Sequence, residues 1–237
     1  MHIIATFAAF LMASTMSSLA THPHKDATSF RHRQLSSPRP YPDPEQVVDD
    51  YLTAARLDMN LTEADISNKR ITNKYSTSHN GITHLYYIQT YEGIDVTNGV
   101  MNFNVDSSGQ VIGKVGSSFV SDLKTKASGI MEPTITPAEA IQCAAVELRL
   151  QSTSPPNLIS SAGGPAQEST FDGDEISQED ITAKLVFYGL ECGGGELAWE
   201  LELSTLNQEF WGNVWVNARS SECIILGKSN WINADGS

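Results

Sequence analysis

The stretch from Tyr75 to Val120 decides the fold and reads YSTSHNGITHLYYIQTYEGIDVTNGVMNFNVDSSGQVIGKVGSSFV. Its turn signals are Asn80-Gly81, Glu92-Gly93 and Asp106-Ser107-Ser108-Gly109. Asn-Gly tolerates a positive φ at both central positions of a two-residue turn, which makes it the strongest short-range signal for a β-hairpin. Between the turns apolar and polar side chains alternate, most regularly from Met101 to Val105. The stretch therefore predicts an antiparallel meander with one buried face.

Helices are predicted on both sides of this meander. Asp43 and Thr136 can each cap a helix whose first residue is proline, and apolar residues recur at i, i+3, i+4 and i+7 after both caps. Further strands are predicted at 183–190, 197–203, 213–218 and 223–227. A helix laid against an antiparallel sheet buries the apolar face of each element. We therefore expect an α+β fold with two units, residues 43–120 and 134–237.

Two segments lack any periodic pattern. Residues 121–133 are predicted to form a linker between the two units. Residues 151–180 are rich in Ser, Pro, Gly and Asp and include Pro155-Pro156. A segment of this length and composition predicts a disordered insertion in the second unit.

The N-terminus has the pattern of an export signal. An apolar run from Ile3 to Met12 is followed by a small-x-small site at Ser18-Leu19-Ala20. This predicts a secretory signal peptide over residues 1–20, and hence a secreted, extracellular chain. Residues 21–42 are polar and rich in Pro, Ser and His, which predicts a flexible leader.

The charge balance excludes two classes of partner. The formal net charge is −13 and the sequence pI is about 4.7. Nucleic acid needs Lys and Arg to neutralise its phosphates, and anionic membrane surfaces attract basic segments. We therefore expect no nucleic-acid partner, and no membrane partner once the signal peptide is removed.

Three cysteines, Cys143, Cys192 and Cys223, leave at least one thiol outside any intramolecular disulfide. Cys192 and Cys223 sit at the ends of predicted strands and could pair, since secretion permits a disulfide. Cys143 lies beside alanines in a predicted helix, which is typical of a small buried hydrophobic residue. The only glycosylation sequon, Asn60-Leu61-Thr62, makes Asn60 a candidate for glycosylation in a surface turn.

No catalytic, cofactor-binding or metal-binding constellation is found. His79 and His84 lie across a predicted turn rather than four apart on a helix, and no third ligand accompanies them. The sequence contains no Gly-x-Ser-x-Gly elbow, no local signature of a thiol nucleophile and no complete phosphate-binding glycine motif. We therefore expect that this chain is not an enzyme as it stands.

A set of short motifs in the meander matches the pattern of a known protein family. They are Ser78-His79-Asn80-Gly81, Thr83-His84-Leu85-Tyr86, Gln89, Gly93-Ile94-x-Val96-x-Asn98, Asn104-Val105-Asp106, Gly109-x-Val111-Ile112 and Ser118-Phe119. This pattern resembles the pro-region module of the fungalysin family of secreted zinc metalloendopeptidases, a module shared with thermolysin-type propeptides. A weaker resemblance to the second module of these pro-regions continues in Leu197-Ala198-Trp199-Glu200-Leu201 and Val214-x-Val216-Asn217-Ala218.

The resemblance implies two cystatin-like units and a pro-region that assists the folding of a metalloprotease catalytic domain and inhibits it until cleavage. Zinc would be held only by that domain, because the family's His-Glu-x-x-His motif does not occur in this sequence. The motif and contact candidates are His84, Gln89, Asn98, Asn102 and Asn104. Two alternatives stay open: the N-terminal fragment of an active zinc metalloendopeptidase precursor, and a free-standing secreted cystatin-like binding module.

Overall fold

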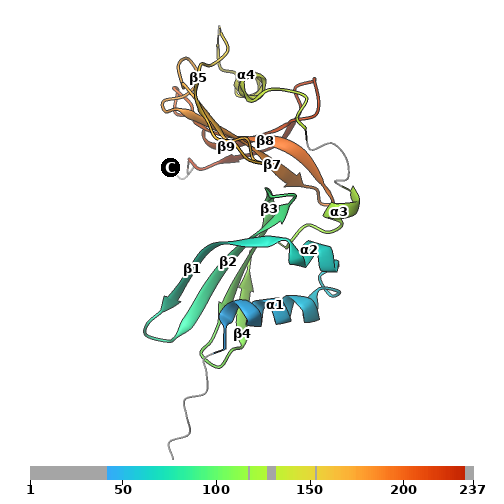
Figure 1. Ribbon diagram of the computed structural model, residues 1–237. Coiled ribbons are helices and arrows are strands. Elements are labelled where there is room, and N and C mark those ends of the chain that lie inside the picture. The colour runs from blue at the N-terminus through green and yellow to red at the C-terminus, as the bar shows by residue number, and fades with distance from the viewer. Residues whose placement is uncertain (1–41, 117, 127–131, 153, 233–237) are drawn as a thin grey trace, which may run out of the picture. The chain divides into compact units, whose positions relative to one another are not determined.

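The computed structural model describes residues 42–116, 118–126, 132–152 and 154–232 (Figure 1). The predicted signal peptide, and all but the last residue of the predicted leader, lie outside these residues. The fold is mixed α+β with a large sheet and few helices, which confirms the predicted class.

The helices and strands follow one another in two groups. In chain order they are α1 (Pro44–Ala55), α2 (Glu63–Ser67), β1 (Lys69–Thr77), β2 (Ile82–Tyr91), β3 (Ile94–Val105), β4 (Val111–Val115), α3 (Leu123–Lys126), α4 (Pro137–Glu147), β5 (Leu158–Ser161), β6 (Ser169–Phe171), β7 (Ile181–Gly189), β8 (Gly195–Ser204), β9 (Trp211–Asn217) and β10 (Ile225–Asn230). We call β1–β4 the N-terminal sheet and β5–β10 the C-terminal sheet.

The predicted helix caps are confirmed. The Asp43 side chain accepts a hydrogen bond from the backbone N–H of Glu45, and Pro44 occupies the first turn of α1. Thr136 and Glu139 form a complete capping box at the start of α4. These side chains pair backbone N–H groups that have no partner inside the helix.

The N-terminal sheet is the predicted antiparallel meander, with its hairpins at the three predicted turns. Leu85 lies opposite Phe103, and both are fully buried. His84 lies opposite Asn104 on the other face of the sheet, where both are half-buried. The alternation read from the sequence therefore assigns each side chain to the correct face.

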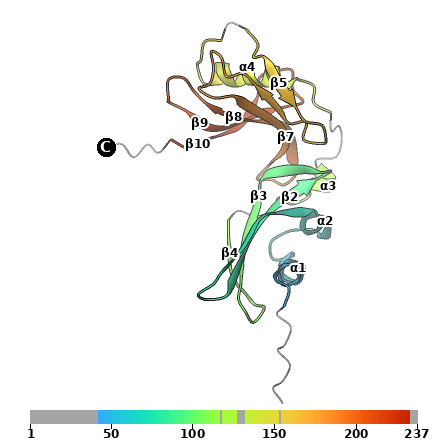
Figure 2. The ribbon, with the colours of Figure 1, turned by 60° about the vertical axis from the view of Figure 1, so that its left-hand side comes forward.

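One face of the N-terminal sheet is covered by helices. Figures 1 and 2 show α1 alongside one face of strands β1–β4. The core there consists of Val48, Leu52, Leu61, Ile66, Leu85, Tyr87, Met101, Phe103, Val105 and Phe119. Among the described residues, no helix covers the opposite face, and this face is therefore left for other contacts.

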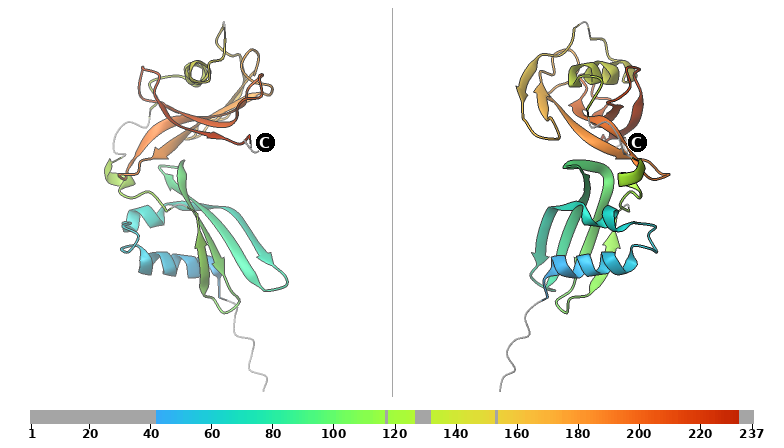
Figure 3. Two further views of the ribbon diagram at one scale, coloured as in Figure 1. Left: turned by 180° about the vertical axis from the view of Figure 1, so that it is seen from behind. Right: turned by 45° about the vertical axis from the view of Figure 1, so that its right-hand side comes forward.

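The C-terminal sheet is built on the same plan. Helix α4 packs on strands β7, β8 and β9, as both panels of Figure 3 show. Trp199 is the largest of its fully buried side chains, and the indole Nε1–H donates to the carbonyl oxygen of Ile135 at 2.9 Å. The bond satisfies the polar atom of an otherwise apolar side chain, so the indole can lie in the core.

The N-terminal and C-terminal sheets are joined through strands β3 and β7. Val96 of β3 pairs with Phe187 of β7 in parallel, and this pairing links all the strands into one ten-stranded sheet within the described residues. The Asn98 side chain adds two hydrogen bonds to the backbone of Gly189, one accepted from the N–H and one donated to the carbonyl oxygen. The buried hydrophobic residues form two clusters. One lies on the N-terminal sheet, and the larger one, on the C-terminal sheet, also includes Ile94 and Val96 of β3.

Two of the predicted irregular segments contain regular structure. The segment 151–180, predicted to be disordered, contains β5 and β6, which form a hairpin on the edge of β7. Phe171 is buried and anchors this hairpin, although its neighbours show no apolar alternation. The predicted linker 121–133 contains the short helix α3. Pairing with a neighbouring strand, rather than local sequence, orders the 151–180 segment.

The predicted pairing of Cys192 with Cys223 is wrong. Cys223 is bonded to Cys143 of α4, across a Cα–Cα distance of 5.5 Å, and Cys192 is an exposed free thiol. The sequence indicated that at least one cysteine is unpaired, but not which helix face lies over the β9–β10 turn. Cys143 is thus a disulfide partner rather than only a small buried hydrophobic residue.

We predict a pH-dependent contribution from the turn between β3 and β4. The Asp106 carboxylate accepts hydrogen bonds from the backbone N–H of Gln110 and from the hydroxyl and N–H of Ser108, and these bonds lower the pKa of Asp106. The ionised side chain therefore stabilises the fold above the ordinary aspartate pKa of about 3.9. This contribution is lost as the pH falls through the lowered pKa.

The test compares wild type with Asp106→Asn, which keeps the shape and removes the charge. In urea unfolding at pH 7 the variant should be less stable than wild type, and this difference in the free energy of unfolding should shrink as the pH is lowered to 2.5. An equal difference in the free energy of unfolding at both pH values would contradict the prediction.

Candidate functional site

The uncovered face of the N-terminal sheet brings together polar and aromatic side chains from three strands. We call it the open face and define it by Tyr75 of β1, His84 and Tyr86 of β2, and Asn102 and Asn104 of β3. The register places Tyr75, His84 and Asn104 in one row across the strands, and Tyr86 and Asn102 in the next. Three of the five predicted candidate residues therefore share this face.

His84 is held from both sides of its ring. Its Nδ1 lies 2.7 Å from the Asn104 Oδ1, and its Nε2 lies 2.8 Å from the Thr77 hydroxyl. Because an amide oxygen only accepts, Nδ1 carries a proton, and in the neutral ring Nε2 then accepts from Thr77. The ring is fixed in orientation and is already bonded at both nitrogens.

Tyr75 covers the His84 ring and pairs with Tyr86. Its ring stacks on the imidazole with 4.7 Å between centroids, and its hydroxyl lies 3.2 Å from the Tyr86 hydroxyl. The hydrogen bond to Tyr75 raises the pKa of Tyr86. Both side chains present rigid aromatic surface with a polar tip, the combination favoured at protein interfaces.

Gln89 and Asn98, the other two predicted candidates, do not lie on the open face. Asn98 bonds to Gly189, as described above. Gln89 is fully buried: its Nε2 donates to the carbonyl oxygens of Asp65 and Val120, and its Oε1 accepts from the Val120 N–H at 2.7 Å. Both amide side chains hydrogen-bond to backbone groups of distant segments. Gln89 joins β2 to α2 and to the segment after β4, and Asn98 joins β3 to β7.

Asp65 completes the junction around Gln89, and sequence reasoning missed it. The buried carboxylate accepts from the N–H and hydroxyl of Thr62 and from the N–H groups of Asp122 and Leu123. The bond from the Thr62 N–H, together with the bond that the Asp65 N–H donates to the Thr62 hydroxyl, forms a capping box, which the motif Thr62-x-x-Asp65 signals. The bonds from Asp122 and Leu123 join α2 to the segment after β4, and no local sequence signal reports them.

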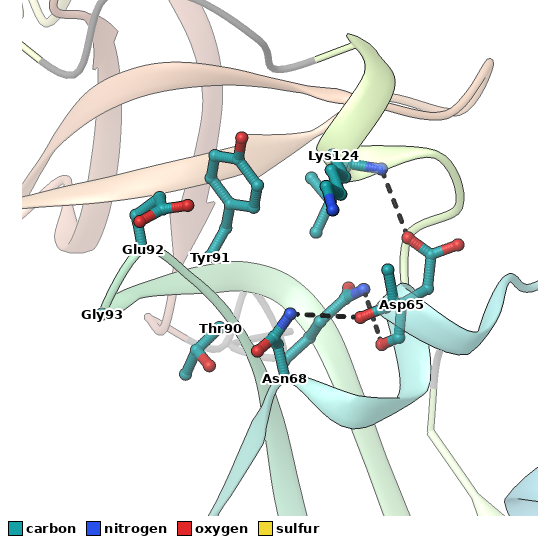
Figure 4. A pocket seen from close by; sticks show the side chains of 10 residues that line it. Asp65, Asn68, Thr90, Tyr91, Glu92, Gly93 and Lys124 are labelled. Carbon is teal, nitrogen blue, oxygen red and sulfur yellow. Dashed lines mark hydrogen bonds between the residues drawn. The ribbon is translucent and has the colours of Figure 1, made fainter.

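A polar pocket of about 520 Å³ lies beside this junction, between the end of α2, the β2–β3 turn and α3. Figure 4 shows Asn68, Tyr91, Glu92 and Lys124 around it. The hydrogen bonds drawn there hold Asp65 and its neighbours together rather than leaving groups pointed at a ligand. The pocket wall is thus part of the structural junction.

Two features are absent from the described ranges: a group of metal-ligating side chains and a membrane-spanning helix. No group of three or more His, Cys, Asp or Glu side chains within them could hold a metal ion. His79 lies exposed in the β1–β2 turn, while His84 is occupied by Thr77 and Asn104. Within the same ranges, no helix is long and apolar enough to span a bilayer.

Comparison with known proteins identifies the class of the N-terminal sheet. Residues 67–118 match the Fungalysin/Thermolysin Propeptide Motif. This range runs from the end of α2 through β4 and includes every residue of the open face.

The wider chain is similar to fungal enzymes. It is 29% identical to extracellular metalloproteinase mep of Aspergillus terreus over 178 residues, which are 74% of this chain and 27% of the relative. It is 25% identical to extracellular metalloproteinase 3 of Arthroderma otae over 205 residues, 86% of this chain and 30% of the relative. It is 33% identical to extracellular metalloproteinase 2 of Phaeosphaeria nodorum over 141 residues, 58% of this chain and 21% of the relative.

The chain therefore carries a fungalysin/thermolysin propeptide module and is homologous to fungal extracellular metalloproteinases of the fungalysin family. The matched region spans between a fifth and a third of the length of these relatives.

Proposed function

We propose that this chain acts as the pro-region of a fungalysin-like extracellular metalloprotease, assisting the folding of the protease domain and inhibiting it. A module that binds the native protease domain, but not its unfolded chain, stabilises the native form by mass action. The same module inhibits if it covers the cleft. Zinc belongs to the protease domain in this proposal, and no cofactor is assigned to the chain described here.

The observation that supports the proposal most is the coincidence of the propeptide motif with a sheet whose second face is uncovered. The residues matched by the motif build both faces, yet α1 and α2 cover only one. On the other face, Tyr75 and Tyr86 are held by each other and by the row from Thr77 to Asn104. Such a preorganised surface loses little conformational entropy when a partner binds.

The same proposal includes the layout of the chain. Residues 1–20 act as a signal peptide and 21–42 as a leader, so the product is secreted. Residues 43–120 and 134–237 form two cystatin-like propeptide units joined through residues 121–133. One hydrophobic cluster lies wholly within residues 43–120 and supports this division, while the other joins Ile94 and Val96 of the first unit to the second unit.

The test is complex formation in trans. The chain is expressed from its full 237-residue sequence in a secreting yeast host. It is then mixed with the mature proteinase of the Aspergillus terreus relative. We expect saturable inhibition of peptide hydrolysis and a complex that survives gel filtration. The double variant Tyr75→Ala, Tyr86→Ala should weaken binding at least tenfold.

Leu57→Ala is the matched control, because Leu57 is highly exposed in the turn after α1 and away from the open face. It should bind like wild type. Circular dichroism shows whether each variant is folded. A folded wild-type chain that neither inhibits nor binds the proteinase would overturn the proposal and leave the chain as a binding module for another partner.

A further inference from the structure

An apolar patch lies at one end of the C-terminal sheet, distinct from the open face. We call it the Trp patch and define it by Leu206, Trp211, Trp231 and Ile232, which are between 38% and 52% exposed. Strand pairing gathers them: Ser204 at the end of β8 pairs with Trp211, and Asn230 at the end of β10 pairs with Gly212. Three strand ends therefore bring four large apolar side chains to one end of the sheet.

The Trp patch is held rigidly by the side chain of Asn230. Its Oδ1 accepts hydrogen bonds from the N–H groups of Trp211 and Ile232, and its Nδ2 donates to the carbonyl oxygen of Glu209. The N–H of Trp231 donates to the carbonyl oxygen of Trp211 at 2.7 Å. The indole rings meet edge to face, with centroids 5.4 Å apart. The patch is thus ordered before any partner arrives.

The composition of the Trp patch is that of a protein-binding surface. Tryptophan is enriched among the residues that dominate binding energy, and such residues are typically surrounded by polar groups that exclude water. Here Asn207, Glu209 and Asn230 supply the polar rim, with Asn207 donating to the Glu209 carboxylate. Large aromatic side chains left in water on an otherwise acidic protein indicate a covered site.

The charge of the chain and the geometry of the two indole rings indicate which kind of partner the Trp patch binds. A second copy of this chain would bring together two acidic surfaces, since each carries a formal charge of −13 and has Glu209 on the rim. The two indole planes stand at 81° to each other, so they do not form one flat platform on which sugar rings could stack. A protein with an apolar side chain flanked by basic groups fits both the apolar patch and the charge.

We propose that the Trp patch is a second docking surface for the metalloprotease domain, reached by the C-terminal sheet independently of the open face. This inference rests on the proposed function. In the relatives, a region like this chain is part of the same polypeptide as a proteinase. A tethered partner is present at a high effective concentration, so two modest surfaces on one pro-region yield tight overall binding.

The experiment labels the full-length secreted chain with 5-fluorotryptophan and records ¹⁹F spectra while the mature Aspergillus terreus proteinase is added. The four tryptophan signals are assigned with single Trp→Phe variants. We expect the Trp211 and Trp231 signals to shift with saturation and the signal of the buried Trp199 to stay unchanged. Binding is measured in parallel for the double variant Trp211→Ser, Trp231→Ser, which should bind at least tenfold more weakly than wild type.

Val146→Ser provides the matched control, because Val146 is an apolar residue on α4 that is 73% exposed. It should bind like wild type. If the complex forms but the Trp211 and Trp231 signals do not shift, and the double variant binds as tightly as wild type, the proposed docking role of the Trp patch is wrong. The proposed function is then unaffected. Absence of any wild-type complex overturns both. Shifts that depend on chain concentration without proteinase assign the patch to a second copy and also overturn the proposal.

Discussion

Replacing Cys143 and Cys223 together by alanine is expected to lower the free energy of unfolding by about 4 kcal/mol. The disulfide closes a loop with a sequence separation of 80 residues. In the chain-entropy description, closing a loop of that length in the unfolded state is worth about 4 to 5 kcal/mol. Since native domains are stable by only about 5 to 15 kcal/mol, this loss is a large share of the total.

The measurement is urea unfolding followed by fluorescence, with and without a thiol reductant. Reduction should destabilise wild type and leave the double variant unchanged. Cys192→Ala is the matched control, because Cys192 is the exposed free thiol and its removal should not change stability. A destabilised Cys192→Ala variant, together with an unaffected Cys143→Ala variant, would show that Cys192 rather than Cys143 is the bonded partner.

Replacing Gln89 by leucine is expected to destabilise the fold by about 3 kcal/mol or more. The leucine side chain fills a similar volume but removes three hydrogen-bond partners, from the carbonyl oxygens of Asp65 and Val120 and from the Val120 N–H. A buried polar group that loses its partner costs about 1 to 3 kcal/mol. The substitution should also detach the segment after β4 from the N-terminal sheet, because Gln89 bonds to Val120 in that segment.

The free energy of unfolding again provides the measurement, and Gln110→Leu, at an exposed position, serves as the control that should be neutral. Gln89→Glu tests the direction of the bonds. The glutamate still accepts from the Val120 N–H, but ionised it places a negative charge against two carbonyl oxygens. Protonation restores one donor, so the deficit of Gln89→Glu relative to wild type should shrink as the pH falls from 7 to 4. A deficit that grows would contradict the assigned roles.

Features that depend on neighbours in the sequence were predicted well. The turns at Asn80-Gly81 and Glu92-Gly93, the capping box at Thr136 and the faces of Met101 to Val105 all follow from local backbone preferences and from the two-residue period of a strand. The open face could likewise be anticipated in part, because His84 and Asn104 alternate with apolar residues.

Features that depend on residues far apart in the sequence were not predicted. Cys143 meets Cys223 because α4 crosses the C-terminal sheet, and β6 is ordered because β7 offers it an edge. Asp65 reaches Asp122 and Leu123 for the same reason. The Trp patch needs three strand ends in register, which no spacing in the sequence reveals.

The bond between Asn98 and Gly189 has a consequence for how such chains can diverge. A side chain at position 189 would clash with both Asn98 and Val120, so this position accepts only glycine while Asn98 is present. The Asn98 side-chain amide in turn hydrogen-bonds to both the N–H and the carbonyl oxygen of Gly189. The two positions, 91 residues apart, are thus physically coupled, and a larger residue at position 189 would require changes at both Asn98 and Val120.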